Sequence, residues 1–202
     1  MEKIVDIRVV KKNLRDKYRK IRENMDKQQK KLYDQMIFEK IILLDVFKNA
    51  KIVFCFVSTD IEVETITLIK YAMLKGKKVA VPKCEDKNGN MNFYLINSFD
   101  DLEKSTFALL EPDTKICQRA SAEDVNNKNS ICVTPGFAYD RYGFRIGFGK
   151  GYYDRFLSHF AGKKIAVCYN ECISTRLPHG KFDVASDLIV TPKYVITSKK
   201  IQ

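Results

Sequence analysis

The segment 145–154, with the sequence RIGFGKGYYD, concentrates residue types that can hold phosphate. Its three alternating glycines allow the backbone to turn sharply and to bring N–H groups close to an anion. Arg145 and Lys150 add fixed positive charge within the same turn. We therefore predict that this segment binds a phosphate chain; the alternative is a glycine-rich turn with incidental charges.

This segment differs from the two common phosphate-binding motifs. Lys150 is followed by glycine and two tyrosines, so the GxxxxGK[ST] spacing of a P-loop is absent. The dinucleotide motif GxGxxG belongs directly after the first strand of a βαβ unit, and this segment lies much later in the chain. We therefore expect a phosphate site of another kind.

A carboxylate follows the glycines after two tyrosines, at Asp154. Next to a triphosphate, such a group commonly helps to hold Mg²⁺, which keeps most of its waters and takes one or two protein oxygens. A second carboxylate could come from Asp183 or Asp187, just before the last predicted strand. A helix cap or a surface salt bridge is the alternative for both, and spacing does not separate these possibilities.

Two glutamates, Glu62 and Glu64, follow the first predicted strand in the run FVSTDIEVET. Either could simply begin a helix, where its charge favours the positive end of the helix dipole. The functional interpretation is that one of them accepts hydrogen bonds from the N–H groups of a heterocyclic substrate.

A third group of candidates lies near the N-terminus, in the run KKNLR. Helical geometry places Lys11 and Arg15 one turn apart on the same face, so that both could reach one phosphate chain. A solvated, charged helix face is the alternative.

The elements that must position these residues follow from the apolar pattern. From residue 52 onward, short β-branched and aromatic runs alternate with helical patterns, which is typical of a mostly parallel sheet covered by helices. Ligands bind such sheets at the carboxyl ends of the strands. We predict strands at 52–57, 78–82, 91–96, 130–134, 164–169 and 188–191, helices at 62–74, 100–103 and 151–160, and a loop at 111–129.

Two helices are predicted between residues 6 and 49. In the first, Leu14, Tyr18 and Ile21 recur at helical spacing, and Asn24 or Asp26 can cap the second. We expect one domain, 1–202, of the α/β class. It is a three-layer α/β/α, Rossmann-like arrangement with a mostly parallel central sheet and the N-terminal helical pair packed on it.

Composition narrows the class of protein. Hydrophobic residues make up 45% and aromatic residues 11%, which is ordinary for a globular protein, and no apolar run is long enough to span a membrane. The first twelve residues carry scattered charges and lack the apolar core of a secretory signal. We expect a cytoplasmic protein. Its six cysteines contain no CxxC, and we predict that they are mostly structural thiols.

Lysine and arginine number 36 against 25 acidic residues, a formal net charge of +11 that favours anionic ligands in general. Basic residues interleaved with aromatic ones also raise the alternative of a nucleic-acid-binding protein, which would bind RNA with a steep salt dependence. A sugar isomerase or a CoA-transferase-like enzyme on a similar scaffold is a further alternative, because a fold does not fix a function.

The run PGFAYDRYGFRIGFGKGYYDRFL, residues 135–157, resembles the signature of the 5-formyltetrahydrofolate cyclo-ligases, also called 5,10-methenyltetrahydrofolate synthetases. KKNLR near the N-terminus, FVSTDIEVET after the first strand and an aspartate before the last strand support the resemblance. The similarity spans nearly the whole chain in the same order.

The resemblance implies ATP and Mg²⁺ as cofactors. It implies that Asp154 and Asp183 hold the metal and that Val57 and Glu62 contact the folate, with the loop 147–152, including Phe148 and Tyr152, facing both ligands. The implied ATP-binding residues are Lys11, Lys12, Asn13, Leu14, Arg15, Arg145, Ile146, Gly147, Phe148, Gly149, Lys150, Gly151, Tyr152 and Tyr153.

The implied reaction closes a ring. ATP phosphorylates the formyl oxygen of 5-formyltetrahydrofolate, N10 attacks the formyl carbon, and phosphate leaves to give 5,10-methenyltetrahydrofolate and ADP. Positioning and charge neutralisation suffice for phosphoryl transfer, so that Arg145, Lys150 and Tyr152 are the expected catalytic residues. The expected partner is the folate alone, with or without a polyglutamate tail; we expect a monomer without nucleic-acid or membrane partners.

Overall fold

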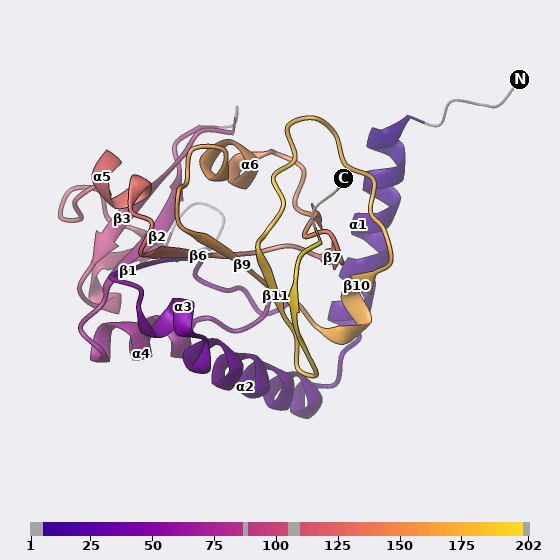
Figure 1. Ribbon diagram of the computed structural model, residues 1–202, viewed down its shortest axis with the longest axis horizontal. Helices are drawn as coiled ribbons and strands as arrows, with labels where there is room; N and C mark the ends of the chain where they lie inside the picture. Colours follow the sequence, from indigo (N-terminus) through magenta and orange to yellow (C-terminus); the bar gives the residue numbers. More distant parts are fainter. Residues whose placement is uncertain (1–5, 87–88, 105–109, 200–202) are drawn as a thin grey trace, which may run out of the picture.

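The computed structural model, which describes residues 6–86, 89–104 and 110–199, is built around one seven-stranded sheet (Figure 1). The strand order is β12-β11-β9-β6-β1-β2-β3, and only the two edge strands, β3 and β12, run antiparallel to their neighbours. The predicted α/β class with a mostly parallel sheet is confirmed. The strands are β1 (Ile52–Cys55), β2 (Lys78–Cys84), β3 (Met91–Ile96), β6 (Ser130–Thr134), β9 (Lys163–Val167), β11 (Leu188–Val190) and β12 (Val195–Thr197).

Both faces of this sheet are buried, as expected of a parallel sheet covered by helices. Along β1 alternate side chains enter different clusters: Val53 and Cys55 join the larger core, whereas Ile52 and Phe54 join a smaller one. The helix α6 (Tyr152–Leu157) covers the smaller cluster through Leu157. On the opposite face lie α2 (Lys27–Leu43), α3 (Asp45–Lys48) and α4 (Ile66–Leu74) (Figure 1).

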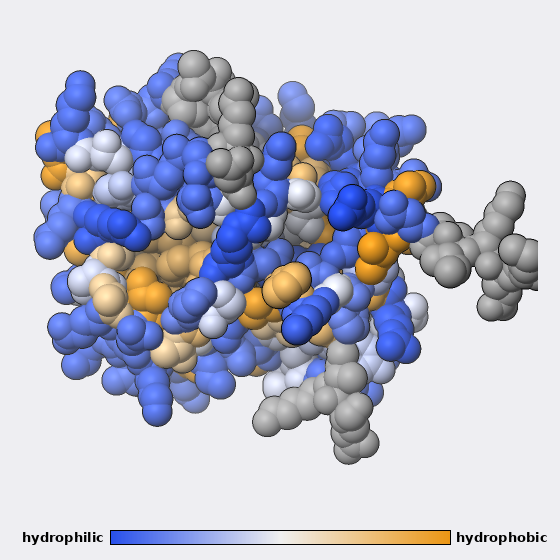
Figure 2. All heavy atoms as spheres, turned by 90° about the horizontal axis from the view of Figure 1, so that it is seen from above, coloured by the Kyte–Doolittle hydropathy of each residue, from blue (hydrophilic) through white to orange (hydrophobic). Residues whose placement is uncertain are grey.

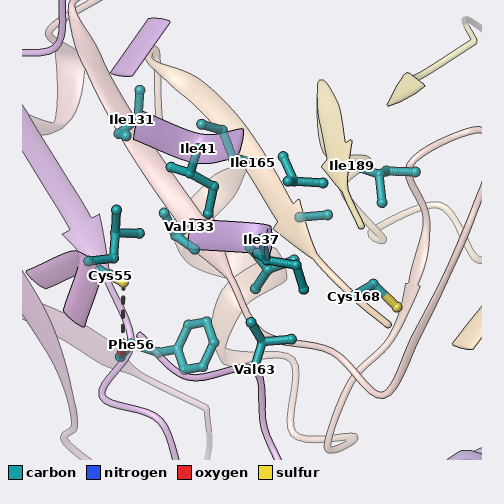
Figure 3. Close-up of a cluster of buried hydrophobic side chains, with 14 of the residues drawn as sticks. Ile37, Ile41, Cys55, Phe56, Val63, Ile131, Val133, Ile165, Cys168 and Ile189 are labelled. Carbon is teal, nitrogen blue, oxygen red and sulfur yellow. Dashed lines mark hydrogen bonds between the residues drawn. The ribbon is translucent and has the colours of Figure 1, made fainter. Parts of the chain in front are cut away.

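The packing of α2 on the sheet is seen in Figure 3, where Ile37 and Ile41 lie among Ile131, Val133 and Ile165. Asp26 caps this helix, because its side chain accepts hydrogen bonds from two backbone N–H groups of the first turn. The other helix of the N-terminal pair, α1 (Ile7–Glu23), lies to one side and contacts β8 and the short 3₁₀ turn η2 (Asn170–Cys172). The basic residues of α1 are thereby placed at the edge of the domain, near the strand ends.

A second sheet has three strands in the order β10-β7-β8, and its strands follow β6 and β9 of the central sheet in the chain. Asp140 organises its hairpin: this fully buried carboxylate accepts hydrogen bonds from the backbone N–H groups of Tyr142, Phe144 and Leu177. This sheet was not predicted from the sequence, because its strands are only two or three residues long. They are β7 (Ala138–Asp140), β8 (Arg145–Ile146) and β10 (Ile173–Ser174).

Several predicted boundaries differ from the structure. Residues 62–65 precede α4 rather than forming its first turn, and the predicted helix at 100–103 is wrong, because a single 3₁₀ turn, η1 (Phe99–Asp101), leads directly into a strand. The predicted loop at 111–129 contains a short helix whose N-terminus is capped by Ser121. The unpredicted elements here are β4 (Leu102–Lys104), β5 (Leu110–Pro112) and α5 (Ala122–Asn126).

Hydrophilic side chains cover most of the face in Figure 2, with hydrophobic ones showing between them towards its middle. None of the helices within the described ranges is long and apolar enough to cross a bilayer. Residues 1–5, part of the segment examined for a secretory signal, lie outside the described residues. All six cysteines are unpaired, and Cys55, Cys132 and Cys168 are fully buried, as predicted for structural thiols.

Candidate active site

A cavity of about 710 Å³ opens at the carboxyl ends of β1, β2 and β6. Its walls come from α1, the loop after β1, the β2–β3 hairpin, β5, the glycine-rich loop after β8 and the segment before β11. Such a volume is typical of a pocket for small-molecule ligands. Of the predicted site residues, those lining it are Lys11, Arg15, Val57, Glu62, every residue of 145–154, and Asp183.

The glycine-rich loop is fastened to α1. The Arg15 guanidinium donates from Nε to the carbonyl oxygen of Gly147 at 2.9 Å. Gly149 has a φ of 93°, and a Cβ built there would lie 2.9 Å from the guanidinium carbon of Arg15. The backbone conformation of this position therefore favours glycine.

Lys150 is the most accessible cation of the loop. Its side chain is exposed at the cavity, and within the described ranges its amino group makes no hydrogen bond or ion pair. The ammonium is therefore available to a ligand. Its backbone is held, because the Lys150 carbonyl accepts a 3.0 Å hydrogen bond from the Arg155 guanidinium.

Arg145 is placed differently from Lys150. It is only 8% exposed, and its two terminal nitrogens bind the Asp154 carboxylate at 2.7 Å and the Val184 carbonyl at 2.9 Å. The same Asp154 oxygen, Oδ1, accepts from the backbone N–H of Val184 at 3.0 Å. This triangle joins β8, α6 and the segment before β11, and places an ion pair in the cavity wall.

Lys11 and Asp183 form an ion pair of 2.5 Å at the cavity. Burial raises the pKa of the Asp183 carboxyl, but hydrogen bonds from the Lys11 ammonium and the Gly180 N–H outweigh it, and the pKa is lowered overall. Asp187, the alternative metal ligand, does not line the cavity; it accepts the Lys164 backbone N–H at 2.8 Å. Of the two candidate carboxylates, the fold brings Asp183 to the site.

Glu62 is 6% exposed and faces the same cavity. Its Oε2 accepts from the Thr59 backbone N–H and from the Thr59 hydroxyl, both at 2.9 Å. Burial raises the pKa of the Glu62 carboxyl, and the Thr59 hydrogen bonds only partly offset this effect. Glu64 does not line the cavity; it accepts the backbone N–H of Thr67 and so caps α4.

The two tyrosines of the loop have different surroundings. The Tyr152 hydroxyl donates to the Asp86 carbonyl at 2.6 Å and so links the loop to the β2–β3 hairpin. Tyr153 packs edge-on against Phe93, and its buried hydroxyl has no hydrogen-bond partner among the described residues. Burial raises the pKa of Tyr153 well above its usual value, so the hydroxyl keeps its proton and can donate to a ligand.

Three residues of KKNLR do not line the cavity. Lys12 and Asn13 are exposed on other faces of α1, and Leu14 packs against the core. Phe148 does line the cavity; half of its surface is exposed, and its ring lies 4.6 Å from that of Phe137. The helical spacing that places Lys11 and Arg15 on one face thus agrees with the structure, whereas the resemblance had included the three residues between them.

Sequence reasoning missed one wall of the cavity. It is formed by the β2–β3 hairpin and the following segments, and Met91, Pro82 and Leu110 make it apolar. The sequence carries little signal for this wall, because isolated apolar residues at strand ends resemble ordinary core residues. The cavity-lining residues that were not predicted include Arg8, Phe56, Thr59, Pro82, Cys84, Met91, Leu110, Glu111 and Pro135.

The donor set fits a magnesium ion held mainly by phosphate and water. Asp154 and Asp183 each use one carboxylate oxygen for protein hydrogen bonds, and the other oxygen has no protein partner within the described ranges. No group of three or more metal-binding side chains occurs among the described residues. Two carboxylates suffice for Mg²⁺ when a nucleotide supplies further oxygens.

Comparison with known proteins identifies the family of the chain. The model of the 5-formyltetrahydrofolate cyclo-ligase family matches residues 7–192. A probable 5-formyltetrahydrofolate cyclo-ligase of Caenorhabditis elegans is 30% identical over 194 residues, which cover 91% of this chain and 93% of the relative. The mitochondrial 5-formyltetrahydrofolate cyclo-ligase of Arabidopsis thaliana is 29% identical over 208 residues, covering 92% and 75% of the two chains.

Solved structures show the same architecture. The NMR structure of the 5,10-methenyltetrahydrofolate synthetase of Aquifex aeolicus superimposes with a TM-score of 0.81 and 30% sequence identity. The superposition covers 96% of this chain and 95% of that one, so the two chains share their fold over nearly their whole length.

Proposed function

The chain belongs to the 5-formyltetrahydrofolate cyclo-ligase family, and we propose that it converts 5-formyltetrahydrofolate and ATP to 5,10-methenyltetrahydrofolate, ADP and phosphate with Mg²⁺. One observation carries the proposal beyond family membership. A single cavity holds the cations Lys11, Arg15 and Lys150 together with a buried carboxylate, Glu62, and an apolar wall. The cations match a polyphosphate, and the buried carboxylate with the apolar wall matches a heterocycle.

We place the phosphate chain against α1 and the glycine-rich loop. Lys11 and Arg15 lie one helical turn apart on the side of α1 that faces the cavity, and Lys150 projects from the loop beside Arg15. Arg145 contributes its charge from the cavity wall while it remains bound to Asp154. Fixed cations in a site that partly excludes water stabilise the charge that develops during phosphoryl transfer.

We place the pterin ring against Glu62 and the apolar wall. Oε1 of Glu62, which has no partner within the described ranges, is a hydrogen-bond acceptor for the N–H groups of a pterin, and Val57 and Tyr152 offer apolar surface in the same cavity. The Tyr153 hydroxyl is a further donor that lacks a protein partner within the described ranges. Together these groups would hold the formyl oxygen towards the cationic end of the cavity.

The proposed chemistry needs no protein nucleophile. The formyl oxygen takes the γ-phosphoryl group of ATP as ADP leaves. N10 then attacks the formyl carbon and releases its proton to water, and the C–O bond breaks as phosphate leaves with the former formyl oxygen. Lys150 is the chain's main contact to the transferring group, because its ammonium is not occupied by a protein group in the described structure. Mg²⁺, held by Asp154 and Asp183, would neutralise charge on the phosphates.

The assay that tests this function mixes purified protein with 5-formyltetrahydrofolate, Mg²⁺ and ATP. We expect the absorbance of the methenyl product to appear together with ADP in a ratio of one to one. Omission of ATP is the control and should abolish the signal. Methenyl formation that consumes no ATP, or no methenyl formation at all, would refute the proposal.

The metal assignment predicts a specific effect of Asp183→Asn. We expect the Mg²⁺ concentration for half-maximal activity to rise at least tenfold, on the order of the losses seen when groups around metal ligands are removed. Calorimetric titration of ATP with and without Mg²⁺ should show a matching loss of metal-dependent affinity. Asp187→Asn is the matched control, since Asp187 does not line the cavity. Equal metal dependence in the two variants would remove Asp183 from the metal site.

We further propose a cytoplasmic monomer without nucleic-acid or membrane partners. The Arabidopsis relative carries a mitochondrial name, so cell fractionation is the appropriate test of compartment. Light scattering after size-exclusion chromatography tests the monomer, and a dimer mass at micromolar concentration would overturn it.

A further inference from the structure

Three buried side chains that carry polar atoms meet beneath the loop that carries Glu62, and each comes from a different element. Arg22 comes from α1, Asp34 from α2 and Tyr169 from the segment directly after β9. Their exposed fractions are 5%, 9% and 0%, and none of them lines the cavity. We propose that these three are positioning residues that fix the loop 58–65 so that Glu62 meets the substrate, an inference that rests on the proposed function.

Asp34 holds the loop on the C-terminal side of Glu62. Its Oδ1 accepts from the Tyr169 hydroxyl at 2.7 Å and from the backbone N–H of Glu64 at 3.1 Å. Its Oδ2 binds the Lys30 ammonium at 2.8 Å. The Tyr169 hydroxyl also lies 3.2 Å from the carbonyl oxygen of Glu62 itself, so the backbone is fixed on both sides of Val63, at the Glu62 carbonyl and at the Glu64 N–H.

Arg22 holds the same loop on its N-terminal side and links it to a second wall. Its guanidinium donates to the Gly136 carbonyl and makes a longer contact of 3.5 Å with the Ile61 carbonyl. The guanidinium carbon lies 5.7 Å from the ring centre of Phe137 and 5.6 Å from that of Tyr169. Ile61 belongs to the loop after β1 and Gly136 to the loop after β6, so Arg22 fixes these two loops relative to each other. The loop after β6 also reaches the cavity, because Pro135 lines it.

The cost of this arrangement argues for a role beyond packing. Burying charged and polar groups is expensive, and well-packed apolar residues of similar volume commonly stabilise a core as well or better. Burial raises the pKa of Tyr169, and the neighbouring Asp34 carboxylate raises it further. The hydroxyl therefore stays protonated at neutral pH and remains a donor. What the polar groups add is a defined geometry for the loop.

Tyr169→Phe tests the proposal with minimal change of volume. We expect the KM for 5-formyltetrahydrofolate to rise about two- to tenfold, the range that corresponds to one net hydrogen bond. The KM for ATP should stay within twofold. Asp34→Asn should have a smaller effect than Asp34→Leu, because the amide retains an oxygen for the Tyr169 hydroxyl and the Glu64 N–H.

Tyr139→Phe is the matched control. Tyr139 is equally buried, and its hydroxyl donates to the Thr134 carbonyl at 2.8 Å, away from the loop 58–65. We expect it to lower the melting temperature without changing the KM for the folate. A similar KM for the folate in Tyr169→Phe and the wild type, or equal rises in both KM values, would reduce Tyr169 to a structural residue.

A double-mutant cycle then asks whether Tyr169 acts through Glu62. In a Glu62→Gln background, Tyr169→Phe should raise the KM for the folate by less than twofold, because the positioned carboxylate is already gone. Fully additive effects would overturn the proposal. Turnover by the wild type is the reference for every comparison, so that absence of methenyl product in the wild type contradicts the proposed function rather than this inference.

Discussion

Lys150→Ala is expected to remove most of the turnover while leaving the protein folded. Lys150 is a lining cation whose ammonium has no protein partner in the described structure and whose backbone is already held by Arg155. We expect kcat to fall by about 10²- to 10³-fold, as when a preorganised donor to a developing charge is lost. Because the side chain is exposed, stability should change by no more than about 0.5 kcal/mol.

Steady-state kinetics with thermal unfolding would check this expectation. Lys128→Ala, at an exposed lysine that does not line the cavity, is the matched control and should behave as the wild type. Lys150→Arg should recover part of kcat, since it retains the charge with a different shape. Unchanged kcat in Lys150→Ala would show that the transferring group is neutralised by other residues.

Glu62→Gln is expected to act on the other substrate. The amide oxygen can replace Oε2 as acceptor from Thr59, so the amide N–H groups would then face the cavity where Oε1 now lies. The N–H groups of the pterin would then face the N–H groups of the glutamine amide, and neither can accept a hydrogen bond from the other. We expect the KM for 5-formyltetrahydrofolate to rise about 10- to 100-fold, from the loss of a hydrogen bond to a charged group, with little change for ATP.

Glu64→Gln is the matched control for this variant. Glu64 lies two residues away, caps α4 through the Thr67 N–H and does not line the cavity. Its KM values should remain those of the wild type. If Glu62→Gln and Glu64→Gln behaved alike, Glu62 would not contact the substrate.

The pH dependence should have a defined sign. Burial raises the pKa of Glu62 in the folded state, so the folded protein binds a proton more readily than the unfolded chain. This group therefore favours folding at acid pH, and its contribution is lost as the pH rises from the ordinary range of a glutamate to the raised value. Glu62→Gln should remove that loss and leave the melting temperature at neutral pH equal or higher. Affinity of the wild type for the folate should instead increase over the same pH interval.

Glu62 is buried, and the residues that hold it in place are largely buried as well. A carboxylate kept charged in a buried position is unfavourable for stability, and Thr59, Tyr169 and Asp34 hold it or its backbone in place. Lys150, which we propose to bind phosphate, is the opposite case, since it is exposed and its amino group makes no hydrogen bond or ion pair within the described ranges. Substitutions at the two ends of the cavity should therefore differ in their effects on stability as well as on kinetics.

Much of the fold was predictable because its signals are local. The strands at 91–96 and 130–134 agree with β3 and β6 to the residue, since each is a β-rich run bounded by polar residues. The predicted helix at 62–74 began four residues early. Tertiary contacts override helix propensity there, because Glu62 bonds back to Thr59 and Asp34 takes the Glu64 N–H.

The local sequence was sufficient to predict that the glycine-rich loop, its two cations and the aspartate that follows would lie together at a ligand cavity. The reason is that turn chemistry and charge depend on neighbouring residues. The local sequence did not determine which charged groups pair with each other. Lys11 pairs with Asp183 across 172 positions, and Asp187 is instead bound to Lys164. Arg145 turned towards Asp154, and Arg22, Asp34 and Tyr169 met beneath Glu62. Charges distant in the chain become neighbours only when β-sheet register and helix packing bring them together, and no single segment of sequence contains that information.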